Sequence, residues 1–136
     1  MIMRPQFGDP ARDVLLAHER VPQWGWLGSL EDALRPAGYG VCRTHSGADT
    51  IERVERGGLA AAVLLGDGQR IEGLSLLRII RSIDSALPCW LVMETPTRRT
   101  MQTAFSLRAT SVMSYPVARE DLSLALMKVL PEQPLG

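Results

Sequence analysis

Side chains that can bind a metal ion, accept a phosphoryl group or move a proton stand directly after the apolar runs of this chain. His18 and Glu19 follow the first run, His45 follows the second, and Gly66 and Asp67 follow the third. Imidazole and carboxylate donors together suit a transition metal. An aspartate supported by a hydroxyl and an ammonium group suits phosphoryl transfer. Either chemistry requires that the apolar runs lie side by side and end at one edge.

Five short apolar runs have the length and composition of β-strands. They cover residues 14–17, 39–43, 60–65, 89–93 and 111–113, of which the run at 39–43 is the most polar. Their apolar character is continuous rather than alternating, which is typical of strands covered on both faces. We therefore expect a sheet with helices on both sides.

The segments between these runs have the periodicity of amphipathic helices. Apolar side chains recur at helical spacing in five sets: Trp26, Leu30, Ala33, Leu34 and Ala37; Ile51 and Val54; Leu76, Ile79, Ile80 and Ile83; Met101, Ala104 and Phe105; Leu122, Ala125, Leu126, Val129 and Leu130. Alternation of strand and helix predicts a parallel sheet with right-handed crossovers. In so short a chain the pattern favours an α/β, doubly wound, flavodoxin-like sheet with the strand order 2-1-3-4-5.

Length and composition fit one globular domain. The chain has 136 residues, of which 46% are hydrophobic and 22% are charged. We expect a domain at residues 13–130, a flexible N-terminal extension at 1–12, and a flexible tail or the start of a linker at 131–136. The 15 basic and 15 acidic side chains cancel. This balance removes the broad attraction that would favour nucleic acid or an anionic membrane as partner.

The two cysteines and the absence of long apolar segments favour a cytoplasmic protein. Cys42 and Cys89 fit neither a disulfide framework nor a zinc spacing, so we expect two reduced core thiols. No stretch approaches the roughly 18 uninterrupted apolar residues of a membrane span. Residues 1–12 lack the apolar stretch of a signal peptide.

The carboxyl ends of the strands are the expected site of function, because in an open parallel sheet the loops there form the binding crevice. The residues placed there are His18-Glu19, Thr44-His45, Gly66-Asp67, Met93-Glu94 and Ser114-Tyr115. We expect His18 and His45 to be exposed loop side chains. The alternative is a transition-metal site that they form with Glu19 and Asp67.

Several segments, in order and spacing, resemble the receiver domains of bacterial two-component response regulators. Residues 73–88 resemble the third helix and following loop of that family. The strand at 89–93, the helix that begins near Thr97, and Tyr115-Pro116 follow with similar spacing. The resemblance covers residues 13–130, with extra length in the first loop at 21–26. It implies a receiver fold and a role in signal transduction through protein partners.

Receiver domains that act as phosphorylation switches carry an acidic pair, an acceptor aspartate, a small hydroxyl residue and a lysine before a proline. The carboxylates hold a divalent cation, and the hydroxyl and lysine stabilise the phosphoryl group. At the matching positions this chain has His18-Glu19, Gly66, Met93 and Tyr115, and Pro116 alone has the expected type. Asp67 is displaced from the acceptor position by one residue. We therefore expect an atypical receiver, or pseudo-receiver, that works without aspartyl phosphorylation and without a cofactor.

Two further functions stay open at this point. One is a phosphorelay receiver phosphorylated on Asp67, with Mg²⁺ bound through Glu19. The other is a small-molecule binder that uses the crevice, although no G-x-G-x-x-G run follows the first strand. We expect no enzymatic activity, because no serine, cysteine or carboxylate nucleophile has a defensible spacing from a histidine.

Surface contacts are expected at three places. Trp24 in the first loop is a candidate anchor for a partner. Arg98 and Arg99 oppose the dipole of the fourth helix and could clamp an acidic partner. Leu124 and Met127 project away from the core-facing stripe of the last helix, near Phe105 and Leu107 of the helix before it. The resemblance to receivers implies a homodimer through the fourth and fifth helices.

Overall fold

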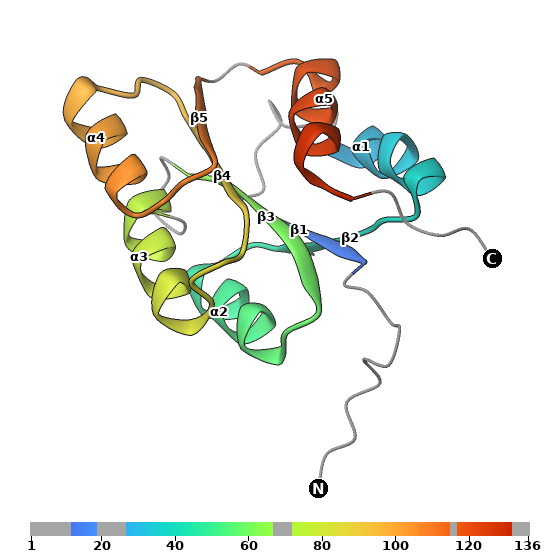
Figure 1. Ribbon diagram of the computed structural model, residues 1–136, viewed down its shortest axis with the longest axis horizontal. Helices are drawn as coiled ribbons and strands as arrows, with labels where there is room; N and C mark the ends of the chain where they lie inside the picture. Colours follow the sequence, from blue (N-terminus) through green and yellow to red (C-terminus); the bar gives the residue numbers. More distant parts are fainter. Residues whose placement is uncertain (1–11, 19–26, 67–71, 115–116, 132–136) are drawn as a thin grey trace, which may run out of the picture.

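The structure is a computed structural model, which describes residues 12–18, 27–66, 72–114 and 117–131. Its centre is a five-stranded parallel sheet with the order β2-β1-β3-β4-β5 (Figure 1). The strands are β1 (Asp13–His18), β2 (Gly40–Thr44), β3 (Leu59–Leu65), β4 (Cys89–Met93) and β5 (Ser111–Ser114). Both the strand order and the parallel pairing predicted from the alternating pattern are confirmed.

Helices cover both faces of the sheet. They are α1 (Leu27–Leu34), α2 (Gly47–Arg56), α3 (Gly73–Ile83), α4 (Arg98–Ser106) and α5 (Arg119–Val129), and the 3₁₀ turn η2 (Arg35–Ala37) follows α1. In Figure 1, α1 and α5 lie on one face of the sheet, while α2, α3 and α4 lie on the other. No helix in the described part of the chain has the length and apolar character needed to cross a membrane.

Each face of the sheet has its own hydrophobic core, because successive side chains of a strand point to opposite faces. Leu16 and Trp90 belong to the core beneath α1 and α5. Their neighbours Leu15 and Leu91 belong to the core beneath α2, α3 and α4. All four side chains are at most 1% exposed, which explains why β1 and β4 read as continuous apolar runs.

Side-chain caps determine where the helices on the second face begin. The Ser46 hydroxyl accepts a hydrogen bond from the Asp49 amide at the start of α2. The Glu72 carboxylate accepts the amides of Leu74 and Ser75 at 3.0 and 3.1 Å at the start of α3. Such caps satisfy amides that have no partner within the helix.

Five side chains of the predicted helical stripes are exposed: Ile79, Ile83 and Val129, and also Met101 and Phe105 of α4, which are 36% and 52% exposed. Ile79 and Ile83 of α3 are 41% and 38% exposed, so they do not lie on the side of the helix that packs against the core. The buried apolar side chains of α3 are Leu76, Leu77 and Ile80. Val129 is 44% exposed at the end of α5, although Leu122, Leu126 and Leu130 on either side of it in the sequence pattern are buried in one core. A spacing of three and four selects a stripe but does not say how wide the buried part is.

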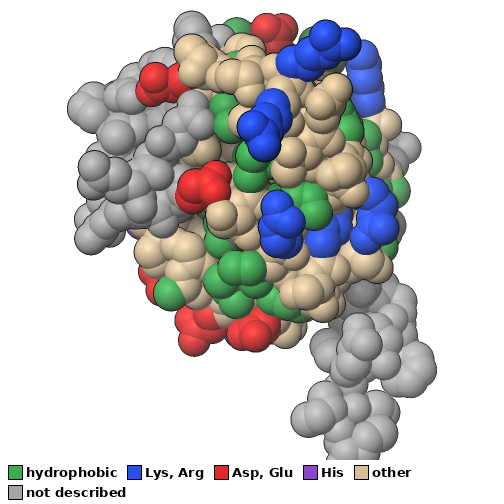
Figure 2. Space-filling view, turned by 90° about the vertical axis from the view of Figure 1, so that its left-hand side faces the viewer, with side chains coloured by type: hydrophobic (Ala, Val, Ile, Leu, Met, Phe, Trp, Pro, Cys, Tyr) green, Lys and Arg blue, Asp and Glu red, His purple; other side chains and the backbone are tan. Residues whose placement is uncertain are grey.

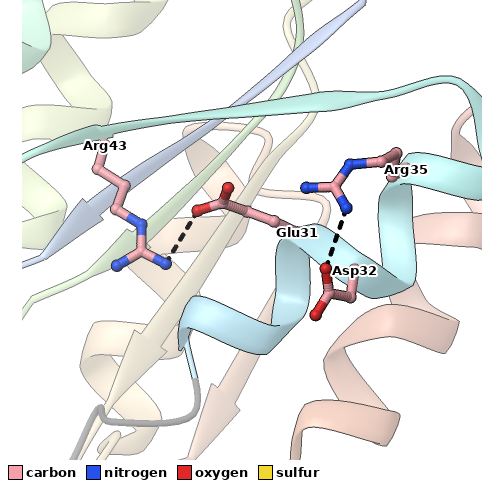
Figure 3. A network of polar contacts seen from close by, with 4 residues as sticks. All are labelled: Glu31, Asp32, Arg35 and Arg43. Carbon is pink, nitrogen blue, oxygen red and sulfur yellow. Dashed lines mark hydrogen bonds and ion pairs between the residues drawn. The ribbon is translucent and has the colours of Figure 1, made fainter.

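Ion pairs connect α1 with its neighbours (Figure 3). Glu31 of α1 pairs with Arg43 of β2 at 3.1 Å, and both side chains are about one-third exposed. Asp32 pairs with Arg35 of η2 at 3.1 Å, with both side chains 71% exposed. Exposed pairs of this kind contribute little to stability, but they leave these arginines with carboxylate partners.

Candidate functional site

The carboxyl ends of the strands meet at one edge, as the parallel topology requires. The register pairs Ala17 with Thr44, and His18 with Leu65. It pairs Leu65 with Val92, and Met93 with Ser114. The prediction that His18, His45, Gly66, Met93 and Ser114 gather at this edge is therefore confirmed. Glu19, Asp67, Tyr115, Pro116 and Trp24 lie outside the described residues.

His18 and His45 form a contact pair. Their ring centroids are 4.7 Å apart with the rings nearly perpendicular, at 87°. The Nδ1 atom of His45 lies 3.0 Å from the carbonyl oxygen of His18. Because a carbonyl oxygen only accepts, this nitrogen donates, and a neutral His45 ring therefore carries its proton on Nδ1. The pair joins the carboxyl end of β1 to the residue that follows β2.

The expectation of two exposed loop histidines is wrong. His18 is the last residue of β1 and is only 6% exposed, and His45 is half-buried. The cause is the position of β1 in the interior of the sheet, between β2 and β3, where a terminal side chain is covered from both sides. Among the described residues, no group of three or more histidine, cysteine, aspartate or glutamate side chains could hold a metal ion.

Gly66 occupies the end of β3 with its backbone bonded on two sides. Its amide donates to the Val92 carbonyl at 3.1 Å, and its carbonyl accepts the Gly73 amide at 3.3 Å. A Cβ at Gly73 would overlap the Cδ1 atom of Leu91 and lie 3.2 Å from the Gly66 carbonyl oxygen. The glycine at the start of α3 therefore lets this helix approach the end of β3 closely.

Met93 closes β4 with a buried side chain that is 7% exposed. It packs in the core beneath α2, α3 and α4. Glu94 and Ser114, the next polar residues at this part of the edge, are exposed. Gly66 and Met93 thus place backbone and apolar groups at the ends of β3 and β4, and the exposed polar group beside them is the Glu94 carboxylate.

A Mg²⁺ ion, which the receiver fold implies, needs several hard oxygen ligands held together. Of the described residues that end β1, β3 and β4, His18, Leu65 and Met93 supply no carboxylate, and Gly66 supplies no side chain at all. These residues do not fit a Mg²⁺ site by themselves.

The two thiols are free, as predicted. Burial raises the pKa of Cys89 to about 11, against a smaller opposing effect of Arg81. Burial also raises the pKa of the half-buried Cys42, and Arg53 partly opposes it. A raised pKa keeps both thiols protonated near neutral pH, so neither is an activated nucleophile.

A groove of about 400 Å³ runs along the outer strand β2 and α2. Its lining includes Cys42, His45, Asp49, Glu52, Arg53 and Arg56. Arg53 is held by Asp13 at 3.1 Å and donates to the Gly57 carbonyl at 2.7 Å. The charges of the lining are mixed, and they select no ligand of one sign.

The predicted surface residues have different exposures. Leu124, Phe105 and Met127 are 62%, 52% and 39% exposed, and Arg98 and Arg99 are exposed in the first turn of α4. Leu107 differs from the expectation: it is half-buried after the end of α4 and packs against the core beneath α2, α3 and α4.

Sequence reasoning missed Arg81, which joins α3 to α4. Its Nε atom donates to the Leu107 carbonyl and its Nη2 atom to the Arg108 carbonyl, both at 2.9 Å. Its Nη1 atom donates to the Asp84 carbonyl at 3.2 Å. No local pattern signals a contact across 26 residues. The capping role of Glu72 was missed as well, because the usual residues at this position are Ser, Thr, Asp and Asn.

Solved structures of other proteins have the same fold. The structure is similar to a CheY-like response regulator receiver domain protein from Methanospirillum hungatei JF-1, with a TM-score of 0.75 and 16% identity over 86% of this chain and 91% of that one. It is similar to the chemotaxis protein CheY4 of Vibrio cholerae, with a TM-score of 0.72 and 19% identity over 88% and 100% of the two chains.

A two-component response regulator from Clostridium difficile gives a TM-score of 0.73 at 13% identity, over 87% of this chain and 94% of that one. No protein-family model and no curated protein matches the sequence. The three likenesses cover 86–88% of this chain at 13–19% identity, so they show the architecture alone. This chain has the fold of response-regulator receiver domains.

Proposed function

We propose that this protein is an atypical receiver that acts in signal transduction through protein contacts, without phosphorylation of an aspartate. The observation that carries the proposal is Gly66. It stands at the end of β3, where receivers that work as switches have the acceptor aspartate, and both its amide and its carbonyl are engaged by neighbouring backbone.

Two other strand ends support the same proposal. His18 stands where an acidic residue would hold the cation, and it is packed against His45. Met93 stands where a hydroxyl would meet the phosphoryl oxygens, and its side chain is buried. Removal of one well-placed stabilising donor costs about 2.7–4 kcal/mol in a transition state. Loss of several such groups together would leave no useful rate of phosphoryl transfer.

A small phosphodonor tests the proposal. The purified protein is incubated with acetyl phosphate and Mg²⁺, and its intact mass is followed over time. We expect the mass to stay unchanged. A phosphorylated species that disappears in Asp67→Asn would instead establish a phosphorelay receiver that uses Asp67, and it would refute the proposal. Hydroxylamine, which cleaves acyl phosphates, is the control for the chemistry of any added group.

We further propose that the protein acts in the cytoplasm and forms a homodimer through α4 and α5. The support for the dimer is the exposure of apolar side chains on both helices: Phe105 of α4, and Leu124 and Met127 of α5, which are three residues apart. Solution mass measured over a range of concentrations tests this. We expect a dimer that Leu124→Glu converts to a monomer, and a wild type that is monomeric throughout would contradict it.

A further inference from the structure

The strongest unexplained feature of the molecule is the set of arginines on α3 and α4. Arg78 is on α3, Arg98 and Arg99 begin α4, and Arg108 follows its end. All four are exposed. In Figure 2, which shows the side of the molecule where α3 and α4 lie, Lys and Arg side chains are spread over the surface with hydrophobic side chains between them.

These arginines differ from four others in the chain. Arg35, Arg43, Arg53 and Arg119 each pair with a carboxylate at 3.0–3.1 Å. Within the described residues, the four arginines of α3 and α4 form no ion pair of that kind, although the charge of Arg78 helps to lower the pKa of Glu72. In the same part of the chain, Arg56 of α2 is likewise without such a pair. The chain as a whole is neutral, with 15 basic and 15 acidic side chains. Residues 72–110 contain five arginines and three acidic residues, Glu72, Asp84 and Glu94, so this surface has a modest excess of positive charge.

Three of the four occupy positions that local helix energetics disfavour. Arg98 and Arg99 stand in the first turn of α4, which has no acidic residue to offset the positive end of the helix dipole. The capping box of Thr97 and Thr100 stabilises that end instead. Arg108 has a φ of 62°, a left-handed conformation that glycine adopts at much lower cost.

The backbone hydrogen bonds explain why a left-handed residue is needed at position 108. The Ala109 amide donates to the Ala104 carbonyl at 3.0 Å, and the Arg108 amide donates to the Phe105 carbonyl at 2.9 Å. This is the usual helix ending in which glycine is the common residue. An arginine there, like the two at the start of α4, contributes a charge at the expense of local stability.

Arg81 holds the surface in a fixed shape. Its guanidinium bonds to the carbonyls of Leu107 and Arg108, so the end of α4 is tied to α3. Arg78 stands three residues before Arg81 on α3, close to the same side of the helix. Arg98 and Arg99 stand at the start of α4, and Arg108 stands just beyond its end at Ser106. A surface whose two helices are tied together loses little freedom when it binds a partner.

Exposed apolar side chains select the class of partner. Arg98, Met101 and Phe105 follow a spacing of three and four on α4 and share one stripe. Met101 and Phe105 are 36% and 52% exposed. Polyanions such as nucleic acid backbones offer nothing for such side chains to pack on. An amphipathic helix offers apolar side chains and carboxylates at the same spacing.

We propose that the surface formed by α3 and α4 binds an acidic, amphipathic helix of a protein partner, about three turns long. Its carboxylates pair with Arg78, Arg98, Arg99 and Arg108, and its apolar side chains pack on Met101 and Phe105. The inference rests on the proposed function in that it names the class of partner for contact-based signalling. It requires neither phosphorylation nor a metal ion. Because the proposed homodimer also uses Phe105, the partner helix and a second copy of the chain compete for this side chain.

The test uses a fluorescent synthetic peptide that forms an amphipathic helix, with Leu on one side and Glu on the other. Binding is measured by fluorescence anisotropy in the absence of phosphodonor and Mg²⁺. Wild type should bind, and salt should weaken the binding. The double variant Arg98→Glu, Arg99→Glu should weaken it about tenfold or more. Arg56→Glu makes the same kind of charge reversal on α2 and should leave the affinity unchanged.

Arg108→Gly separates binding from folding. Glycine relieves the left-handed conformation, so this variant should unfold at a higher urea concentration than wild type and yet bind the peptide more weakly. Arg98→Glu, Arg99→Glu should likewise be at least as stable as wild type, because acids suit the first turn of a helix. A loss of binding that accompanies a loss of stability in these variants would contradict the proposal.

Three other outcomes would overturn the inference. One is no peptide binding by wild type. Another is equal weakening by Arg56→Glu, which would mean non-specific attraction. The third is tighter binding of a double-stranded oligonucleotide of equal charge, which would assign the surface to nucleic acid. The result with phosphodonor is independent, so phosphorylation on Asp67 would refute the proposed function and leave the binding result intact.

Discussion

The carboxyl edge of the sheet and the outer surface of α4 use their polar groups in opposite ways. At the edge, Gly66 has no side chain and its backbone is bonded to β4 and α3, while Met93 is buried. On α4, the charged side chains of Arg98 and Arg99 are exposed at a helix end that disfavours them. The edge is built for packing, whereas α4 retains groups that lower its own stability.

This contrast indicates where selection for something other than stability has acted. A buried edge with satisfied backbone needs no ligand to be stable. Exposed charges at unfavourable positions need another explanation, and a binding partner is the simplest one. Four predictions test the comparison, and they are ordered here by the size of the expected effect on the free energy of unfolding.

The largest difference in the free energy of unfolding should come from truncating a buried aromatic side chain of the sheet and an exposed one on α4. Trp90 of β4 is 1% exposed in the core beneath α1 and α5, whereas Phe105 of α4 is 52% exposed. Trp90→Ala should lower the free energy of unfolding by about 3–5 kcal/mol, because it leaves a cavity. Phe105→Ala should change it by about 0.5 kcal/mol or less. Urea unfolding measures both, and a large cost for Phe105→Ala would mean that this side chain serves the fold.

A methyl group added at the edge should have the next largest effect on the free energy of unfolding. Gly73→Ala places a carbon against Leu91 and close to the Gly66 carbonyl, so it should cost about 1–3 kcal/mol. Leu91→Val opens space at the point of overlap. The double variant should therefore cost less than the sum of the two single variants in urea unfolding. Simple additivity would show that α3 does not approach β3 as closely as described.

Removal of the link between α3 and α4 should have a moderate effect. Arg81→Met keeps the apolar stem but leaves the Leu107 and Arg108 carbonyls without their charged donor. We expect a loss of about 1–2 kcal/mol in the free energy of unfolding. Hydrogen exchange should also become faster in α4, and faster exchange confined to α5 would argue against the link.

The cap of α3 should give the smallest effect, and it should depend on pH. Burial raises the pKa of Glu72, but hydrogen bonds from Ser75 and the Leu74 amide, with a contribution from Arg78, outweigh it and hold the pKa below the ordinary 4.5. A carboxyl group with a lowered folded-state pKa stabilises the fold above its ordinary pKa and loses this effect as pH falls through the lowered value.

Accordingly, Glu72→Gln should cost about 1 kcal/mol at pH 7. The difference from wild type should shrink as the pH falls below 4.5, where the wild-type carboxyl becomes protonated. Urea unfolding at pH 7 and pH 3.5 measures the difference. A cost that is equal at both values would show that the ionised carboxylate is not the capping group.

Local patterns predicted the architecture but not the surroundings of individual side chains. The continuous apolar runs and the alternation with helices were enough for the sheet order, because parallel strands buried on both faces leave that signature. The burial of His18 was missed, since a polar residue at a strand end reads as a loop residue. Ile79 and Ile83 were assigned to the core because periodicity alone cannot separate a narrow buried stripe from a wide one.

The candidate site was predicted in part for the same reason. Its location follows from topology, and Gly66 and Met93 are visible in the sequence as departures from the receiver pattern. The contact between His18 and His45 and the role of Arg81 depend on residues 27 and 26 positions apart. Such contacts arise from the packing of elements and have no local signal.

Beryllofluoride, a stable analogue of the phosphoryl group, provides the most direct test of whether the carboxyl edge has lost its phosphoryl chemistry. The measurement is an amide NMR spectrum of the protein with Mg²⁺, before and after addition of beryllofluoride. We predict that the resonances of His18, Gly66 and Met93 do not move. Specific shifts of these resonances that saturate with beryllofluoride and vanish in Asp67→Asn would contradict the prediction and show a working acceptor site.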